Sequence, residues 1–205
     1  MIVIVDYGMG NSGSILNMLK KVGVPSLISS LPNDIEQADK LILPGVGAFD
    51  KAMINLKNLG IIPVLSQKVI EGKTPILGIC LGMQLLANSS EEGQLPGLAW
   101  IDAEVKKFQF GANESRLKIP HMGWNLINVK KPSLLLKDLE TGSRFYFVHS
   151  YHMVCKDKRD ELTETFHGYY VTSAVEKNNI LGVQFHPEKS HKFGMKLLEN
   201  FVEYF

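Results

Sequence analysis

The 205-residue chain has few cysteines, almost no net charge and no long apolar run. Its two cysteines, Cys80 and Cys155, are too few for a disulfide scaffold and lack the paired spacing of a zinc site. Because 22 basic and 21 acidic side chains leave a net charge of +1, we expect no nucleic-acid binding through a basic surface. No run approaches the roughly 18 apolar residues that a membrane span needs, so we expect no membrane contact.

The composition is that of a globular protein. Hydrophobic residues make up 45% and charged residues 21% of the chain, which excludes disorder, and the lack of a repeat excludes fibrous architectures. The length predicts a single domain over residues 1–205. The N-terminal Met1–Asp6 segment has no basic residue before its apolar run, so we expect no signal peptide and a cytoplasmic protein.

Strand-like and helix-like segments alternate in the first half of the chain. Short all-apolar runs predict strands buried on both faces of a parallel sheet, with helical spacing between them. We expect Gly23 to end the first helix, and Asn33 and Asp34 to cap a short second one. Breaks near Gly60 and Pro63 should divide two further helices. The predicted strands are 2–5, 26–29, 41–43 and 75–79, and the later helices lie within 48–71 and from Cys80 through Leu86. This alternation predicts a doubly wound α/β sheet.

The second half adds antiparallel strands. Ile101, Ala103 and Val105 alternate with charged residues, as in a strand with one solvent face. The charged stretch 156–161 is expected to be the solvated tip of a hairpin. Further strands are predicted over 127–129, 144–148, 169–175 and 181–185. A final helix is predicted from an apolar stripe of Leu197, Leu198, Phe201, Val202 and Phe205.

A glycine-rich segment, Gly8–Gly13, matches the dinucleotide-binding pattern G-x-G-x-x-G between a strand and a helix. The acidic residue expected at the end of the second strand is missing, because Ser29 and Ser30 stand there. Asp6 and Tyr7 also separate the strand from the first glycine. The pattern therefore favours a tight turn over a cofactor site.

The segment Gly78–Gly82 has the pattern G-x-C-x-G between an apolar strand and an apolar helix. This is the layout of a nucleophile elbow, in which flanking glycines permit a sharp turn that exposes the central side chain. Cys80 would lie at a helix N-terminus, where the dipole and free N–H groups favour the thiolate. A buried packing cysteine is the alternative. We expect Cys155 to be such a packing cysteine and favour Cys80 as a nucleophile.

A cysteine nucleophile needs a histidine base and a group that orients the base. Among the six histidines, His186 follows an apolar strand, and Pro187 holds the backbone extended before Glu188. Side chains two residues apart in an extended segment share a face. Glu188 can therefore accept a hydrogen bond from one imidazole nitrogen while the other nitrogen faces Cys80. An edge-strand histidine beside a solvated glutamate is the alternative, which the nucleophile elbow disfavours.

A candidate oxyanion site lies in Pro44–Gly47, at the carboxyl end of a predicted parallel strand, where α/β sheets place their sites. Glycines on both sides of Val46 leave the peptide groups free to point N–H donors at a developing oxyanion. In isolation the segment is only a turn, so its interpretation depends on the other two motifs.

Together, Pro44–Gly47, Gly78–Gly82 and the 186–188 triplet resemble, in order and approximate spacing, the motifs of class I (triad-type) glutamine amidotransferases. The resemblance covers essentially the whole chain. It implies a flavodoxin-like parallel sheet flanked by helices with an antiparallel extension, and neither a metal nor another cofactor. It also implies hydrolysis of the L-glutamine side-chain amide, with Cys80 as nucleophile, His186 as proton shuttle and Glu188 orienting it. The ammonia is consumed by a partner.

The resemblance implies further roles. The oxyanion hole would comprise Gly45, Val46, Gly47 and Leu81. The substrate glutamine would be held by Gln84, His149, Ser150 and Tyr151. The partner would be faced by Pro120, His121, Met122, Gly123, Trp124 and Asn125, with Trp124 as an aromatic anchor. An ordinary core tryptophan is the alternative for Trp124.

Within the family, the chain most resembles stand-alone glutaminase subunits that supply ammonia to a separate cyclase or synthase subunit in histidine biosynthesis. The signatures are 5–11, 120–125, 146–151 and 182–190. Ser12, Gly13 and the run 190–195 depart from that pattern and look more like paralogues that serve bacterial surface-sugar synthesis. The two alternatives share the triad and differ in the partner and the final acceptor of the ammonia. A non-catalytic scaffold protein is disfavoured because the triad is intact.

Overall fold

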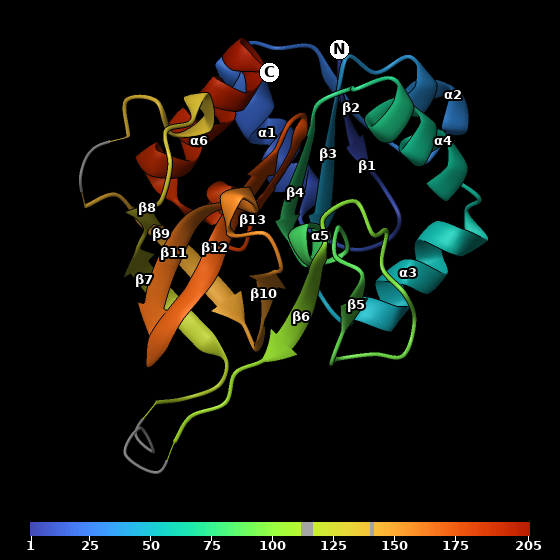
Figure 1. Cartoon of the computed structure of the whole chain (residues 1–205). Coiled ribbons are helices and arrows are strands. Elements are labelled where there is room, and N and C mark those ends of the chain that lie inside the picture. The colour runs from blue at the N-terminus through green and yellow to red at the C-terminus, as the bar shows by residue number, and fades with distance from the viewer. Residues whose placement is uncertain (112–116, 140–141) are drawn as a thin grey trace.

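The computed structural model describes residues 1–111, 117–139 and 142–205. Parallel strands form the centre of the larger sheet in the order β2-β1-β3-β4-β13, which is the strand order of flavodoxin-like folds. The strands are β1 (Ile2–Val5), β2 (Ser26–Ser29), β3 (Lys40–Gly45), β4 (Ile76–Cys80) and β13 (Ile180–Val183). The predicted α/β sheet is confirmed, and Figure 1 shows these strands between flanking helices.

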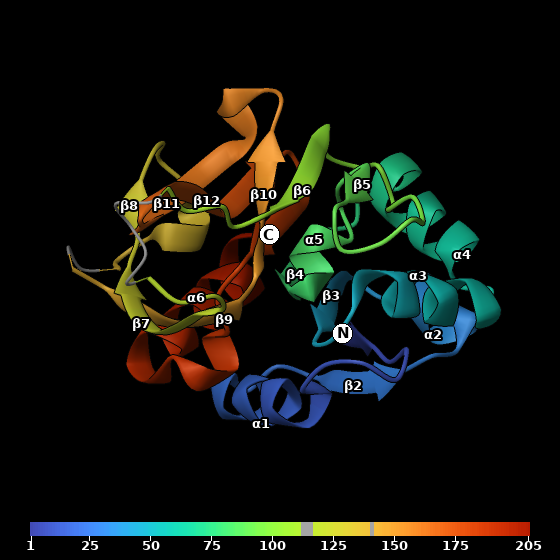
Figure 2. The same cartoon turned by 90° about the horizontal axis from the view of Figure 1, so that it is seen from below.

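Helices cover both faces of the parallel strands (Figure 1 and Figure 2). On one face lie α1 (Ser12–Val22) and α6 (His191–Tyr204), which contact each other. On the other lie α2 (Pro32–Glu36), α3 (Phe49–Asn58) and α4 (Ile62–Ser66), followed by a π-helical turn over Gln67–Glu71. Within the described part of the chain, no helix is long and apolar enough to cross a membrane.

The alternation of side chains along β1 shows why its run is apolar throughout. Val3 and Val5 pack in the core that contains Phe49 and Leu56 of α3. Ile2 and Ile4 pack in the core on the opposite face, with helices α1 and α6. A strand that is buried on both faces has no position for a polar side chain. The all-apolar run 2–5 was therefore enough to predict β1 from the sequence.

Antiparallel strands extend the sheet beyond β13 in the order β12-β10-β6. The antiparallel strands of this extension are β6 (Ala103–Lys107), β10 (Tyr151–Cys155), β11 (Glu161–His167) and β12 (Tyr169–Lys177), whereas β9 (Arg144–His149) lies outside the larger sheet. The short strand β5 (Ser89–Ser90) pairs with β6, and β8 (Asn128–Val129) pairs with β11. Strand β7 (His121–Leu126) pairs with β9 in a separate small sheet. The predicted antiparallel extension is confirmed, although β7, β10 and β11 were not predicted.

Local predictions for two helices were wrong. Helix α5 (Leu81–Gln84) after the elbow is a single turn and does not continue through Leu86. Helix α2 begins at Pro32 with Leu31 before it, because proline is suited to the first helical turn. The predicted break between two helices within 48–71 is confirmed: α3 ends before Gly60, where φ is +66°, and Pro63 lies in the first turn of α4.

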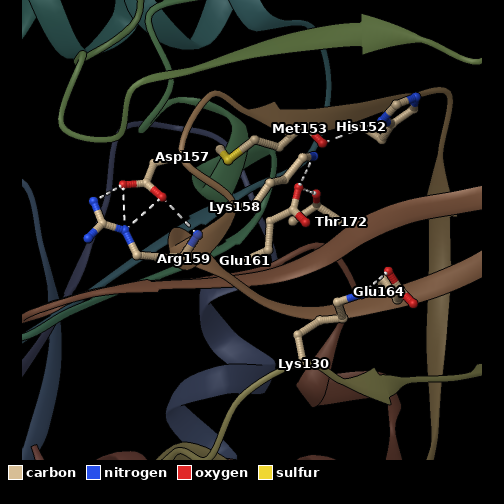
Figure 3. A network of polar contacts seen from close by, with 9 residues as sticks. All are labelled: Lys130, His152, Met153, Asp157, Lys158, Arg159, Glu161, Glu164 and Thr172. Atoms are coloured by element: carbon tan, nitrogen blue, oxygen red, sulfur yellow. Dashed lines mark hydrogen bonds and ion pairs between the residues drawn. The ribbon is translucent and has the colours of Figure 1, made fainter.

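The charged stretch 156–161 is not a hairpin tip. The strands on either side of it, β10 and β11, both pair with β12 and not with each other. Figure 3 shows the polar contacts that hold this connection. Glu161 is buried and accepts hydrogen bonds from Lys158 (2.6 Å) and Thr172 (2.9 Å). Its carboxylate therefore faces inward, whereas an alternating charge pattern suggested solvent.

The elbow after β4 depends on close backbone packing. A Cβ atom on Gly82 would overlap the carbonyl oxygen of Leu43 in β3, and one on Gly78 would lie 2.8 Å from the carbonyl oxygen of Gly82. Both positions therefore require glycine, since any side chain would push α5 away from the sheet. The approach places the first turn of α5 directly against the end of β3.

Gly82→Ala is expected to lower the free energy of unfolding by about 1–3 kcal/mol, because the added methyl group displaces packed backbone. Urea unfolding followed by circular dichroism measures the change. Gly13→Ala is the matched control: a Cβ there meets no atom within 4 Å, and replacing a helical glycine stabilises by about 0.5–1 kcal/mol. Equal stability of the Gly82 variant and the wild type would contradict the close approach.

Candidate active site

A cavity of about 250 Å³ lies where the carboxyl ends of β3 and β4 meet the antiparallel strands. It brings together Cys80, His186 and the predicted glutamine-binding residues from segments far apart in the sequence. Gly45 and Glu188 are not in the lining: Gly45 lies beside Cys80 in the sheet register, and Glu188 contacts His186. The lining residues are Val46, Gly47, Cys80, Leu81, Gln84, Glu92, Pro120, Val148, His149, Ser150, Tyr151, His186 and Lys189.

Cys80 has the strained backbone of a nucleophile elbow. Its φ of 55° and ψ of −110° lie in a region that non-glycine residues rarely adopt. The strain is maintained by the glycine packing around α5, and it turns the side chain towards the cavity. The Nε2 amide of Gln184 lies 3.6 Å from Sγ. Gln184 was not predicted, although it is fully buried in the strand segment that leads to His186.

His186 and Glu188 form a buried pair. The imidazole Nδ1 lies 2.8 Å from Oε1 of Glu188, and the two side chains are 2% and 1% exposed. Burial alone lowers the pKa of His186, but hydrogen bonds and charge from Cys80 and Glu188 outweigh it and raise the pKa to about 9. Glu188 occupies Nδ1, which leaves the buried Nε2 as the ring nitrogen available to Cys80. Cys80 and His186 line the same cavity, and Glu188 contacts the imidazole at Nδ1.

The backbone of this pair is also fixed. The His186 N–H donates to the carbonyl oxygen of Tyr146 in β9 (2.9 Å). The Ser190 hydroxyl, fully buried, donates to the carbonyl oxygen of His186 (2.6 Å). Each bond joins His186 to a different neighbouring segment, so the imidazole has little freedom to turn from the thiol.

The glycine-rich segment Gly8–Gly13 packs against the candidate oxyanion segment. Tyr7 is buried and donates its hydroxyl to the carbonyl oxygen of Pro44 (2.5 Å), and burial raises its pKa. Hypothetical Cβ atoms on Gly10 and Gly47 would lie 2.9 Å from Pro44 Cβ and 2.7 Å from Met9 Cε, respectively. The favoured tight turn therefore supports residues 44–47.

Gln84 and His149 build the cavity wall. Both bond the carbonyl oxygen of Tyr151, at 3.1 Å from Gln84 Nε2 and 2.7 Å from His149 Nδ1. Gln84 Nε2 also donates to Oε1 of Gln184 (3.0 Å). Burial lowers the pKa of His149 to about 3, so its ring is neutral. These side chains thus shape the wall through the Ser150–Tyr151 backbone.

Glu92 and Lys189 line the cavity but were not predicted. Glu92 Oε2 accepts the N–H of Phe49 at the start of α3 (2.9 Å), and burial raises its pKa. It lies in a loop with no periodic pattern, so only the folded chain brings it to Cys80. Among the described residues, no group of three or more His, Cys, Asp or Glu side chains could hold a metal ion.

The predicted partner segment is strand β7, whose two faces differ. Met122, Trp124 and Leu126 point outward and are 62%, 44% and 43% exposed. Trp124 stacks on the ring of His191 at 5.3 Å and is thus no core residue. His121 on the other face is buried, and Pro120 lines the cavity. The exposed apolar face therefore borders the candidate site.

Comparisons with known proteins agree with this geometry. The family model described as Glutamine amidotransferase class-I matches residues 3–204. A relative from Methanococcus maripaludis, named imidazole glycerol phosphate synthase subunit HisH 2, is 57% identical over 99% of each chain. A relative of the same name from Pseudomonas aeruginosa is 51% identical over the same shares.

A solved structure shares the fold. A crystal structure described as that of a glutamine amidotransferase has a TM-score of 0.74 and 19% sequence identity to this chain. The match covers 99% of this chain and 98% of that chain. The helices and strands are therefore arranged alike over nearly the whole length of both chains.

We expect the imidazole of His186 to be a cation at neutral pH and to become neutral as the pH rises through about 9, because its pKa is raised to about 9. Glu188→Gln should lower that pKa by about 1–3 units, since the carboxylate that favours the cation is removed. Titration of the imidazole resonances by NMR measures both values. His152, whose pKa is lowered by burial, is the internal control. A wild-type His186 that titrates at the ordinary value of 6.5 would contradict the pairing.

Proposed function

Because the chain belongs to the class-I glutamine amidotransferase family, we propose that it hydrolyses L-glutamine to glutamate and ammonia. The observation that carries this proposal is the strained Cys80 beside the buried His186–Glu188 pair. We propose further that it is the glutaminase subunit of an imidazole glycerol phosphate synthase. The names of both relatives support that assignment over surface-sugar synthesis.

The first half of the reaction makes a thioester. The Cys80 thiolate attacks the amide carbon of glutamine, and the C=O electrons move onto oxygen. When the tetrahedral intermediate collapses, the C–N bond breaks and the leaving nitrogen takes a proton from His186 Nε2. Ammonia and a glutamyl thioester result. The raised pKa of His186 supports this role, because the ring carries the required proton at neutral pH.

The second half hydrolyses the thioester. His186, now neutral, removes a proton from water, whose oxygen attacks the thioester carbon. The C–S bond then breaks, which releases glutamate and restores the thiolate and the protonated imidazole. Glu188 stabilises the imidazolium in both halves and holds the ring with Nε2 towards the reacting atoms.

Backbone N–H groups would stabilise the oxyanion. Leu81 directly follows Cys80 and is the first residue of α5, so its N–H has no partner within the helix. Val46 and Gly47 line the same cavity, and Gly45 pairs with Cys80 in the sheet register. Gly47 adopts a φ of +116° that favours glycine. These donors act where negative charge develops in the transition state.

Glu92 is suited to bind the α-ammonium group of glutamine. It presents a carboxylate to the same cavity as Cys80, and glutamine is a zwitterion with a positive group at its far end. The wall formed by Gln84, His149, Ser150 and Tyr151 would hold the rest of the amino acid. A cavity of about 250 Å³ suits a single amino acid.

The outward face of β7 is suited to the partner. Its apolar side chains, Met122, Trp124 and Leu126, are exposed next to Pro120 at the cavity. Aromatic and methionine side chains are enriched at such interfaces. We propose that a cyclase subunit binds there and consumes the ammonia to form imidazole glycerol phosphate and AICAR. Both cysteines are free, as expected if the two subunits act in the reducing cytoplasm.

Cys80→Ala should abolish glutamine hydrolysis, because no other group replaces the thiolate. The test measures glutamate release by the chain alone and with a cyclase subunit of the histidine pathway. We expect stimulation by the cyclase in the wild type and in Cys155→Ala, a matched control at a buried cysteine outside the site. The complex with Cys80→Ala should still use free ammonia. No turnover under either condition, or full activity of Cys80→Ala, would refute the proposal.

Glu92→Gln should raise the KM for glutamine about tenfold or more with little change in kcat, because loss of a charge-assisted hydrogen bond weakens ground-state and transition-state binding alike. Glutamine at this position keeps an oxygen for the Phe49 N–H, so α3 retains its partner. Steady-state kinetics measures both constants. Glu91→Gln is the control, since Glu91 is exposed and bonds Lys107 outside the cavity. An unchanged KM would remove Glu92 from the binding site.

A further inference from the structure

Strand β7 has an inner face as well as the exposed one. His121 on this face is 4% exposed and pairs with His149 in the register of β7 and β9. Its ring stacks on Phe147 (4.7 Å) and on His167 (4.3 Å). His149 reaches the wall of the candidate active site. The pair of His121 and His149 therefore connects β7, which carries the exposed apolar face, to the cavity.

A chain of hydrogen bonds runs through this pair. Asn125 Nδ2 lies 3.1 Å from His121 Nε2, and His121 Nδ1 lies 3.0 Å from His149 Nε2. His149 Nδ1 lies 2.7 Å from the carbonyl oxygen of Tyr151. Asn125 Nδ2 also donates to the carbonyl oxygen of Phe166 (2.9 Å). Each member contacts the next through a different atom, so no contact competes with another for one ring nitrogen.

The two ends of the chain determine its direction. The carbonyl oxygen of Tyr151 can only accept, so Nδ1 of His149 carries the proton and Nε2 of a neutral ring accepts. His121 must then donate from Nδ1 and accept at Nε2. The carbonyl oxygen of Phe166 can also only accept, which places the NH₂ of Asn125, and not its oxygen, beside His121. The chain thus donates from Asn125 through His121 and His149 to Tyr151.

Neutral rings are required for this direction, and the surroundings keep them neutral. Burial lowers the pKa of His149 to about 3 and that of His121 to about 4. A second proton on His149 would lie on Nε2 and face the Nδ1–H of His121, and a second proton on His121 would lie on Nε2 and face the NH₂ of Asn125. Phe108 packs against both rings, at 6.3 Å and 5.2 Å between centroids.

We propose that His121 is a positioning residue of the glutaminase site: together with the Tyr151 carbonyl oxygen it holds His149 in the Nδ1–H tautomer, and His149 in turn holds the Tyr151 carbonyl that shapes the glutamine pocket. The kinetic part of this proposal rests on the proposed function. We call the hydrogen bonds from Asn125 through His121 and His149 to Tyr151 the relay. A partner bound to the outer face of β7 would contact the same strand whose inner face carries the relay to the pocket wall. His121 itself does not touch the cavity.

The first test uses the full-length wild-type chain without substrate. Long-range ¹H–¹⁵N NMR spectra of the imidazole rings report which nitrogen carries the proton. We expect His121 and His149 both to be the neutral Nδ1–H tautomer at neutral pH. The Nε2–H tautomer at either ring would overturn the relay, whatever the chain's activity. A chain that hydrolyses no glutamine would refute the proposed function but leave this test valid.

The second test separates positioning from folding. His121→Leu removes the donor, and we expect a KM for glutamine raised about fivefold, the value of one hydrogen bond, with kcat within twofold. His121→Asn places an NH₂ group near the former Nδ1 and should restore the KM to within twofold. In His121→Leu, Nε2 of His149 loses its donor, so the spectra should show the Nε2–H form of His149 populated beside the Nδ1–H form that the Tyr151 carbonyl oxygen favours.

His152→Leu is the matched control. His152 is 5% exposed, lies in the same aromatic cluster against Phe108 (5.0 Å) and bonds the hydroxyl of Tyr169 (3.0 Å), outside the relay. Its KM should stay within twofold of the wild type. A rise equal to that of His121→Leu, or an unchanged KM in His121→Leu, would show that His121 only packs.

Discussion

The candidate active site depends on the parallel pairing of β4 with both β3 and β13. Gly45 pairs with Cys80 at the end of β3, and Val183 pairs with Ile79 on the other side. Strand β13 comes about a hundred residues after β4, yet the register brings His186 to the same sheet edge as the thiol. Parallel strands end at the same edge of a sheet. The oxyanion segment, the nucleophile and the base therefore meet there because each directly follows, or ends, one of these neighbouring strands.

The parts of this site that sequence could predict carry their signals locally. The elbow glycines at 78 and 82 surround Cys80, and Glu188 lies two residues from its histidine. Glu92 and Gln184 have no such signal, because only the folded chain brings the loop of Glu92 to the cavity and the segment after β13 to Cys80. Strand β7 was missed for a related reason: polar and apolar side chains alternate on it, but its inward positions are the buried His121 and the partly buried Gly123 and Asn125.

Buried histidines in this chain have opposite properties, and their partners explain the difference. His186 interacts with Cys80 and with the Glu188 carboxylate, whose hydrogen bonds and charges together outweigh burial and raise its pKa to about 9. His149 faces a carbonyl oxygen and another imidazole, so burial prevails and lowers its pKa to about 3. A proton carrier thus lies on one side of the cavity and a neutral, fixed hydrogen-bond pair on the other. Burial alone would have made both rings neutral.

The hydrogen bond between the neutral rings of His121 and His149 also specifies the register of β7 against β9. A slip of one residue against β9 would turn His121 and Asn125 to solvent and bring Met122 and Trp124 inward. His149 Nε2 would then be buried without a donor, which costs more than an ordinary hydrogen bond is worth. The apolar side chains therefore stay on the outside, although burial would otherwise favour them within. An exposed apolar face beside the cavity is thus a consequence of the polar chain behind it.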